Sequence, residues 1–187
     1  GIPSFQVTNS TQSTISAIIT VTPSYENNGI ICDGNAETFT IVVNPSPEMN
    51  NADDIVLCNN EISTIIEFTT PNTDGNTTYT WTNDNTSIGL SSSGNGDIPS
   101  FTAINLNPIT EVATITVTPT YENNGVVCIG DPQTFSISVL SEIGISGSTV
   151  DALDCNDPNS GNINITVTGG SGVYDLSLIH ISEPTRR

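Results

Sequence analysis

The chain has 187 residues, of which 20 are Asp or Glu and 2 are Lys or Arg, and its formal net charge is -18. This charge argues against nucleic-acid binding, because contacts to phosphates need cationic side chains, and against docking on anionic membranes, which basic clusters promote. No run of about 18 apolar residues occurs, so no membrane insertion is expected. The chain begins at Gly1 without a signal-peptide pattern, and we expect a fragment or mature piece of a longer protein.

Short strand-like segments predict an all-β fold. Thr, Ile and Val are frequent whereas Leu, Ala and Lys are scarce, a composition that favours strands over helices. Segments 111–118 and 134–140 alternate apolar and polar residues, as half-buried strands of an antiparallel sheet do. Turn residues such as Asn124 and Gly125 separate the segments. In chain order, the expected strands are 54–58, 61–69, 77–82, 98–104, 111–118 and 134–140.

An internal repeat organises the chain. Without gaps, about 23 of 42 positions near the N-terminus are identical to residues about 96 positions further on. That spacing is too long for a solenoid coil and fits one immunoglobulin-sized sandwich domain of roughly 100 residues. The repeated runs are IPSF at 2–5 and 98–101, ITVTP at 19–23 and 115–119, and YENNG at 25–29 and 121–125.

The repeat also indicates domain boundaries. Residues 1–46 correspond to the C-terminal half of one copy, and residues 47–140 form one complete antiparallel β-sandwich. The Asn-Pro-Ser-Pro join at 44–47 is typical of a short stiff linker, because two prolines fix φ. The single Trp81 falls on a central strand, and we predict that it lies in the core. An exposed platform for stacking on sugars is the alternative.

The four cysteines predict disulfides rather than a zinc site, because they include no CxxC pair and the only histidine lies in the tail. Cys58 ends the first strand of the complete copy and Cys128 precedes its last strand, so we expect them to be bonded. Closing a loop of about 70 residues would stabilise the fold by roughly 4 kcal/mol. Reduced core thiols are the alternative. Cys32 and Cys155 would be unpaired through truncation. A disulfide would indicate an extracellular setting.

Catalysis and cofactor binding are not expected. Nucleophilic serine or cysteine chemistry needs a base, and no His or Lys occurs before position 180. A carboxylate pair could hydrolyse glycosides, but no two acids are singled out by their setting, so we assign no catalytic, cofactor or metal residues. Calcium is the one cation that the oxygen-rich loops suit, whereas the plainer interpretation is turn residues and surface charge. The candidate calcium loops are Asp53-Asp54, Asp84 and 157–159.

Four runs of the complete copy form a recognisable pattern: TYTWTNDNTSIGL (78–90), GDIPSF (96–101), ATITVTPTYENNGVVC (113–128) and PQTFSISV (132–139). This pattern resembles the PKD-like repeats of very large surface proteins in gliding bacteria. The resemblance covers about 140 residues, counting the half copy. It implies immunoglobulin-like sandwiches in tandem array, displayed outside the cell, with adhesive or spacer roles and no catalysis.

The C-terminal region has a different pattern. The run DCNDPNSGNINITVTGGSGVYDLSL (154–178) is similar to the start of an SprB-type repeat, so residues 144–175 are interpreted as the N-terminal part of such a module. This resemblance implies an adhesin of gliding motility exported by type IX secretion. The final run LSLIHISEPTR (176–186) resembles a translated sequencing adapter, which indicates that residues 176–187 are an artefact of metagenomic assembly.

These features together predict a non-catalytic fragment of a secreted bacterial cell-surface repeat protein, an adhesin or its stalk. Its expected partners are the neighbouring repeats of the same chain, with surface glycans or other cell-surface proteins as further candidates. Weak sites would add in avidity along such an array. The alternative is a set of spacer or carbohydrate-binding modules within a secreted multidomain enzyme.

Overall fold

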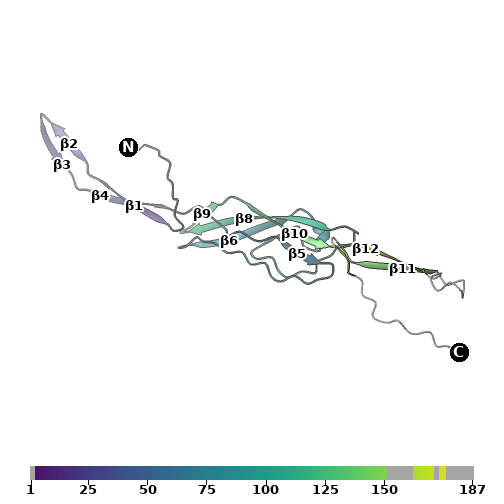
Figure 1. The fold of residues 1–187 in the computed structure, drawn as a ribbon. Coiled ribbons are helices and arrows are strands. Elements are labelled where there is room, and N and C mark those ends of the chain that lie inside the picture. The colour runs from purple at the N-terminus through teal and green to yellow at the C-terminus, as the bar shows by residue number, and fades with distance from the viewer. Residues whose placement is uncertain (1–2, 151–161, 171–172, 176–187) are drawn as a thin grey trace, which may run out of the picture.

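The computed structural model describes residues 3–150, 162–170 and 173–175, and its fold is all-β. Among these residues the only helical element is a single 3-10 turn, η1 (Thr86–Ile88). Figure 1 shows an elongated molecule in which the N-terminal strands and the last two strands lie at opposite ends. Several predictions concern positions outside the described residues: Cys155, the 157–159 calcium loop and the adapter-like tail at 176–187.

Residues 47–140, called the second copy below, contain a six-stranded sheet. The path of the sheet runs β5-β10-β8-β6-β7, and β9 pairs with the part of β8 that continues past the end of β10. All of these pairings are antiparallel except that of β5 with β10, which is parallel. The strands are β5 (Ile55–Cys58), β6 (Asn76–Asn83), β7 (Ser93–Asn95), β8 (Glu111–Asn123), β9 (Val126–Ile129) and β10 (Gln133–Leu140).

A second layer covers one face of this sheet, which gives the second copy a sandwich-like form. The layer consists of two segments, 61–69 and 98–104, which meet through two isolated bridges, Ile62–Thr102 and Ile66–Ile98. Both segments are predicted as full strands, yet side chains supply part of their pairing. Phe101 N donates to Ser63 Oγ at 3.0 Å, and Phe68 N donates to Asp97 Oδ1 at 2.9 Å. Side-chain acceptors and Pro99, which has no N–H, interrupt a regular ladder.

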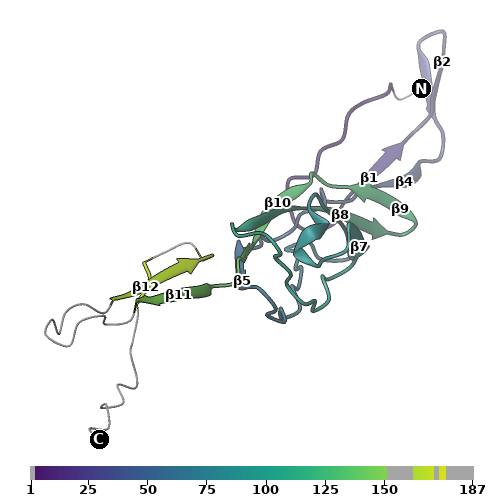
Figure 2. The ribbon, with the colours of Figure 1, turned by 90° about the vertical axis from the view of Figure 1, so that its right-hand side faces the viewer.

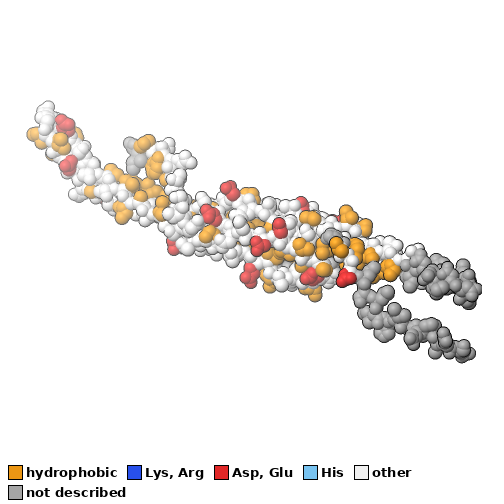
Figure 3. Space-filling view, in the orientation of Figure 1, with side chains coloured by type: hydrophobic (Ala, Val, Ile, Leu, Met, Phe, Trp, Pro, Cys, Tyr) orange, Lys and Arg blue, Asp and Glu red, His pale blue; other side chains and the backbone are white. Residues whose placement is uncertain are grey.

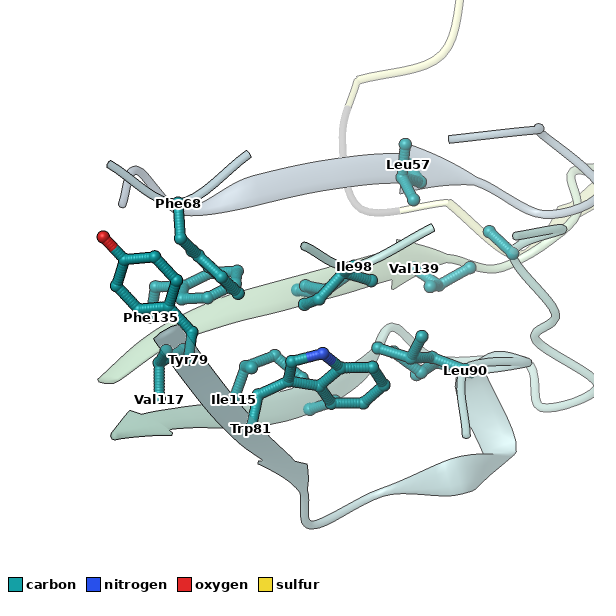
Figure 4. Close-up of a cluster of buried hydrophobic side chains, with 14 of the residues drawn as sticks. Leu57, Phe68, Tyr79, Trp81, Leu90, Ile98, Ile115, Val117, Phe135 and Val139 are labelled. Carbon is teal, nitrogen blue, oxygen red and sulfur yellow. The ribbon is translucent and has the colours of Figure 1, made fainter. Parts of the chain in front are cut away.

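The core lies between these two layers. Alternate side chains of β8 and β10 point into it, as the period-two pattern predicts. Trp81 has only 3% of its surface exposed, so it is a core residue and offers no surface for sugar stacking. Its indole lies with Ile98, Leu90 and Ile115 (Figure 4). Gly94 pairs with Trp81, and an added Cβ there would approach the indole to 2.3 Å, so only glycine leaves room for the ring.

Residues 3–46, called the first copy below, form two antiparallel pairs, β1 with β4 and β2 with β3. Their registers reproduce those of the second copy at an offset of 96 residues. Ile19 pairs with Phe39 as Ile115 pairs with Phe135, and the turn at 28–29 has the same positive φ values as the turn at 124–125. The strands are β1 (Ile15–Val21), β2 (Ser24–Asn27), β3 (Ile30–Asp33) and β4 (Glu37–Val43).

A last hairpin follows the second copy. Its strands are β11 (Gly144–Val150) and β12 (Asn162–Thr168), which pair antiparallel (Figure 2). The hairpin contacts the end of the second copy through Gly170 N, which donates to Ser141 Oγ at 2.7 Å. Gly169 has φ +78°, and an added Cβ there would lie 1.8 Å from Glu142 O, so the close approach depends on glycine.

Candidate functional site

The joint, the interface between the first and the second copy, is the candidate functional site. It contains more hydrogen bonds than any other interface between separate parts of the described chain. It is built from the loop at 9–14, the linker at 44–48, the loop at 70–75 and the end of β8. Both linker prolines, Pro45 and Pro47, are buried, so the linker is part of the packed interface. Because proline fixes φ, its path is conformationally restricted.

Gln12 takes part in more hydrogen bonds across the joint than any other residue of the first copy. Its main-chain carbonyl accepts from Thr73 N at 2.8 Å, and its side-chain amide donates to Glu48 Oε2 at 2.9 Å. Its side-chain oxygen accepts from Asn72 Nδ2 at 3.2 Å, and the same nitrogen donates to Ser46 O at 3.0 Å. One residue of the first copy is therefore bonded to both the linker and a loop of the second copy.

Tyr121 anchors the other side of the joint. Its ring is fully buried, and its hydroxyl donates to Thr73 O at 2.9 Å and lies 3.3 Å from Thr14 Oγ1. Asn123 Nδ2 donates to Thr14 Oγ1 at 2.8 Å. The ring packs directly over Gly75, where an added Cβ would lie 2.4 Å from Tyr121 Cζ. The periodicity identified Tyr121 as a repeated residue, but no sequence signal marks it as a contact between repeats.

A groove of about 590 Å³ opens beside the joint. It lies between the end of β4 and the β8–β9 hairpin, and its surface is mostly apolar. Cys128 lies in it, half-buried. The other lining residues are Val7, Thr8, Asn9, Val42, Val43, Asn44, Pro45, Ser46, Pro47, Asn123, Asn124, Val126 and Ile129.

The cysteine pairing predicted from sequence is wrong. Cys58 and Cys128 are both free thiols at opposite ends of the second copy. Cys58 pairs with Leu140, one residue past the partner of Glu111, whereas Cys128 pairs with Tyr121. Glu111 and Tyr121 are ten residues apart on one strand, or about 33 Å at the usual rise, whereas a disulfide needs Cα atoms within about 7 Å. Cys32 is an exposed free thiol on β3.

Two of the acidic residues proposed for calcium, Asp54 and Asp84, lie next to strand ends and accept hydrogen bonds there. Asp54 Oδ1 accepts from Ser136 N at 2.7 Å, and Asp84 Oδ1 accepts from Thr114 N at 2.7 Å. The bond from Ser136 N lowers the pKa of Asp54. Within residues 3–150, 162–170 and 173–175, no three His, Cys, Asp or Glu side chains come together as a metal site would require. Figure 3 shows the acids scattered over the visible surface.

Glu111 has the most hydrogen bonds of the acidic side chains that the structure describes. It accepts from the amides of Asn85 and Asn107 and from the hydroxyl of Ser87. These bonds, led by that of Asn85, hold its pKa below the usual range. Burial instead raises the pKa of the Tyr79 hydroxyl in the core.

No family model, curated protein or solved structure matches the chain. A search of the described residues for a helix long and apolar enough to cross a membrane also found none. A function for this chain therefore has to be inferred from the physical features of the joint.

Proposed function

We propose that the chain is a non-catalytic segment of a secreted bacterial cell-surface repeat protein, in which PKD-like, immunoglobulin-like sandwiches follow one another to form a stalk. In this proposal the C-terminal hairpin belongs to an SprB-type module, and the parent protein is an adhesin of gliding motility exported by type IX secretion. The observation that carries the stalk role is the joint, in which buried prolines and hydrogen bonds from Gln12 connect consecutive copies.

The physical argument concerns stiffness. Domains joined by small interfaces move relative to one another unless the interface restrains them. Here the linker is packed, and hydrogen bonds connect the two copies at two places, one where Gln12 bonds to Glu48 and Asn72 and one where Thr14 lies beside the Tyr121 hydroxyl. Copies arranged end to end with fixed joints extend a binding tip away from its attachment point (Figure 1). A stalk of this kind needs neither catalytic residues nor a cofactor.

Small-angle X-ray scattering of the full chain tests this role. The wild type should have a maximum dimension that matches the extended arrangement. A variant with Pro45→Gly, Pro47→Gly and Gln12→Gly should show a broader distribution of interatomic distances, because two φ restraints and the side-chain bonds of Gln12 are lost. The matched control is Gln6→Gly, a change at an exposed position outside the joint. Identical distributions for wild type and joint variant would contradict the stalk role.

A receptor role for the second copy lacks a supporting feature. A sugar-binding sandwich needs an exposed aromatic platform, and the Trp81 indole is instead packed in the core. Incubating the full chain with a glycan array provides the check. Binding that survives Tyr25→Ala, which removes an exposed aromatic ring of the first copy, would favour the carbohydrate-binding alternative over a passive spacer.

A further inference from the structure

The first copy has an open sheet edge. In the second copy, β10 lies between β8 and β5, and residues 137–140 pair in parallel with Ile55–Cys58. Its counterpart β4 pairs only with β1 among the described residues. Residues 41–44, which correspond to 137–140, therefore present an edge that the second copy uses for a parallel strand. An unpaired edge of this kind accepts a further strand readily.

The face beside this edge is also uncovered. Phe39 has 43% of its surface exposed, whereas its counterpart Phe135 has 5%. In the second copy, the segments 61–69 and 98–104 form the covering layer, which includes Phe68, whose ring centroid lies 6.3 Å from that of Phe135. Figure 3 shows the apolar side chains at the surface of the N-terminal strands. The equivalent face of the second copy is covered in part by residues 61–69, which have no counterpart among residues 3–46.

The groove at the joint is located where the end of that parallel strand would lie. Three groove residues of the first copy, Val7, Asn9 and Asn44, correspond to residues that contact the turn at 58–60 in the second copy. These contacts are the pairing of Leu140 with Cys58, the bond from Asn105 N to Asn59 Oδ1 at 2.8 Å, and the bond from Asn60 N to Ala103 O at 2.8 Å.

The geometry of Asn9 shows that the first copy preserves this arrangement. Its side-chain nitrogen donates to Ser13 O and Val43 O, at 2.8 and 2.9 Å. Asn105 donates to the carbonyl oxygens of Ile109 and Val139, the equivalent residues, both at 2.8 Å. The first copy therefore already has the local structure that positions the 58–60 turn.

Cys128 enters the same groove from the second copy, on the β8–β9 hairpin. We propose that the open edge of β4 binds residues 47–97 of a further repeat copy, and that the Cys58 of that copy forms a disulfide with Cys128 across the joint. Cys58 of one repeat is thus bonded to Cys128 of the next, which accounts for their separation within one copy. This inference does not depend on the stalk role.

The chemistry is a thiol–disulfide exchange. One cysteine thiolate attacks an external disulfide, such as oxidised glutathione, and displaces one thiolate to form a mixed disulfide. The second cysteine thiolate then attacks the protein sulfur of that mixed disulfide and releases the other external thiolate. Two thiols are oxidised to one disulfide, the external disulfide is reduced to two thiols, and the two protons pass to solvent or to the released thiolates.

The test extends the full chain by one segment. A second copy of residues 47–97 is placed directly before Ile2, replacing Gly1, so that position 97 precedes Ile2 as it precedes Ile98 in the natural repeat. After oxidation with glutathione at alkaline pH, a non-reducing peptic digest is examined by mass spectrometry. The native cysteine carries the change Cys58→Ser, because the two Cys58 peptides would otherwise be identical, and we expect a peptide that links the added Cys58 to Cys128. Amide hydrogen exchange along β1 and β4 should slow by at least about tenfold relative to the unextended chain, because the open edge becomes paired.

Matched variants separate the possible outcomes. In the extended chain, Cys128→Ser should abolish the linked peptide, whereas Cys32→Ser should leave it intact. A link between the added Cys58 and Cys32, or slowed exchange with both thiols free, would overturn the disulfide. Unchanged exchange along β4 would overturn the docking itself. Exchange within β8 and β10 monitors the fold of the second copy throughout.

Discussion

The two copies contain the same sequence pattern in two different environments. Their strands have equivalent registers and their turns have the same left-handed φ values, at a constant offset of 96 residues. Their burial differs sharply, since Ile115 is fully buried while Ile19 is only half-buried. Hairpin pairing depends on residues close in sequence, whereas burial depends on a covering layer contributed by residues that lie earlier in the repeat.

The largest contrast should come from the matched phenylalanines. Phe135→Ala removes a buried ring from the core and should lower the free energy of unfolding by about 3–5 kcal/mol. Phe39→Ala, at the equivalent but largely uncovered position, should cost less than about 1 kcal/mol. Urea titration followed by Trp81 fluorescence measures the first loss, because Trp81 is the only tryptophan and lies in the second copy. Calorimetry of the whole chain measures the second. Equal losses would contradict the contrast in burial.

The next contrast concerns the equivalent glycines Gly130 and Gly34. An added Cβ at Gly130 would lie 2.3 Å from Pro47 O, so Gly130→Ala should push the linker away and cost about 1–3 kcal/mol. At Gly34 the nearest atom is Pro23 Cγ at 2.9 Å, and this ring carbon can shift by a change of pucker. Gly34→Ala should therefore have a smaller effect. Denaturation midpoints rank the two variants, and scattering shows whether only Gly130→Ala loosens the joint.

A smaller effect is expected from the matched tyrosines. Tyr121→Phe removes the hydroxyl that donates to Thr73 O and should cost about 1 kcal/mol, the usual contribution of one hydrogen bond. Tyr25→Phe should leave stability unchanged, because 67% of the Tyr25 surface is exposed. Thermal unfolding of both variants under identical conditions provides the measurement. A loss of the same size in Tyr25→Phe would show that the joint is not the cause.

The smallest contrast is one of pH dependence. The ordinary pKa of 3.8 for Asp54 is lowered on folding by the bond from Ser136 N, so its ionised form stabilises the fold above pH 3.8. That contribution disappears as pH falls through the lower folded pKa. In the first copy, Thr40 on β4 is the counterpart of Ser136, and no described acid lies at the open edge beside it. Wild type should exceed Asp54→Asn in stability at pH 7, and the difference should decrease as pH falls below 3.8. A constant difference across this range would argue against the linkage.

Much of the second copy could be predicted from sequence because its signals are local. Alternation located β8 and β10, and turn residues located the turn at 124–125, whereas β9 was not predicted as a strand. Two features could not be predicted in this way. The segments at 61–69 and 98–104 form only isolated bridges, because the side chains of Ser63 and Asp97 accept hydrogen bonds from backbone N–H groups. β8 also continues through Pro119, whose carbonyl accepts from Gly130 N.

The cysteines show why the candidate site was harder to predict. Cys58 and Cys128 lie near the two ends of one repeat in sequence, which made a bond between them plausible. The parallel pairing of β5 with β10 and the fold-back of β9 place them at opposite ends of the sheet instead. Sequence spacing does not specify strand direction, so it did not specify which thiol could reach which.

The sequence by itself determined the all-β character, the 96-residue repeat and the strong negative charge, because strand propensity, alternation and charge are properties of residues and their near neighbours. Only the tertiary structure decided which repeated side chains are buried, how Gln12 and Tyr121 connect the copies, and where each cysteine lies. These features depend on contacts between residues far apart in the chain. Identical local patterns therefore reach different environments when different segments cover them.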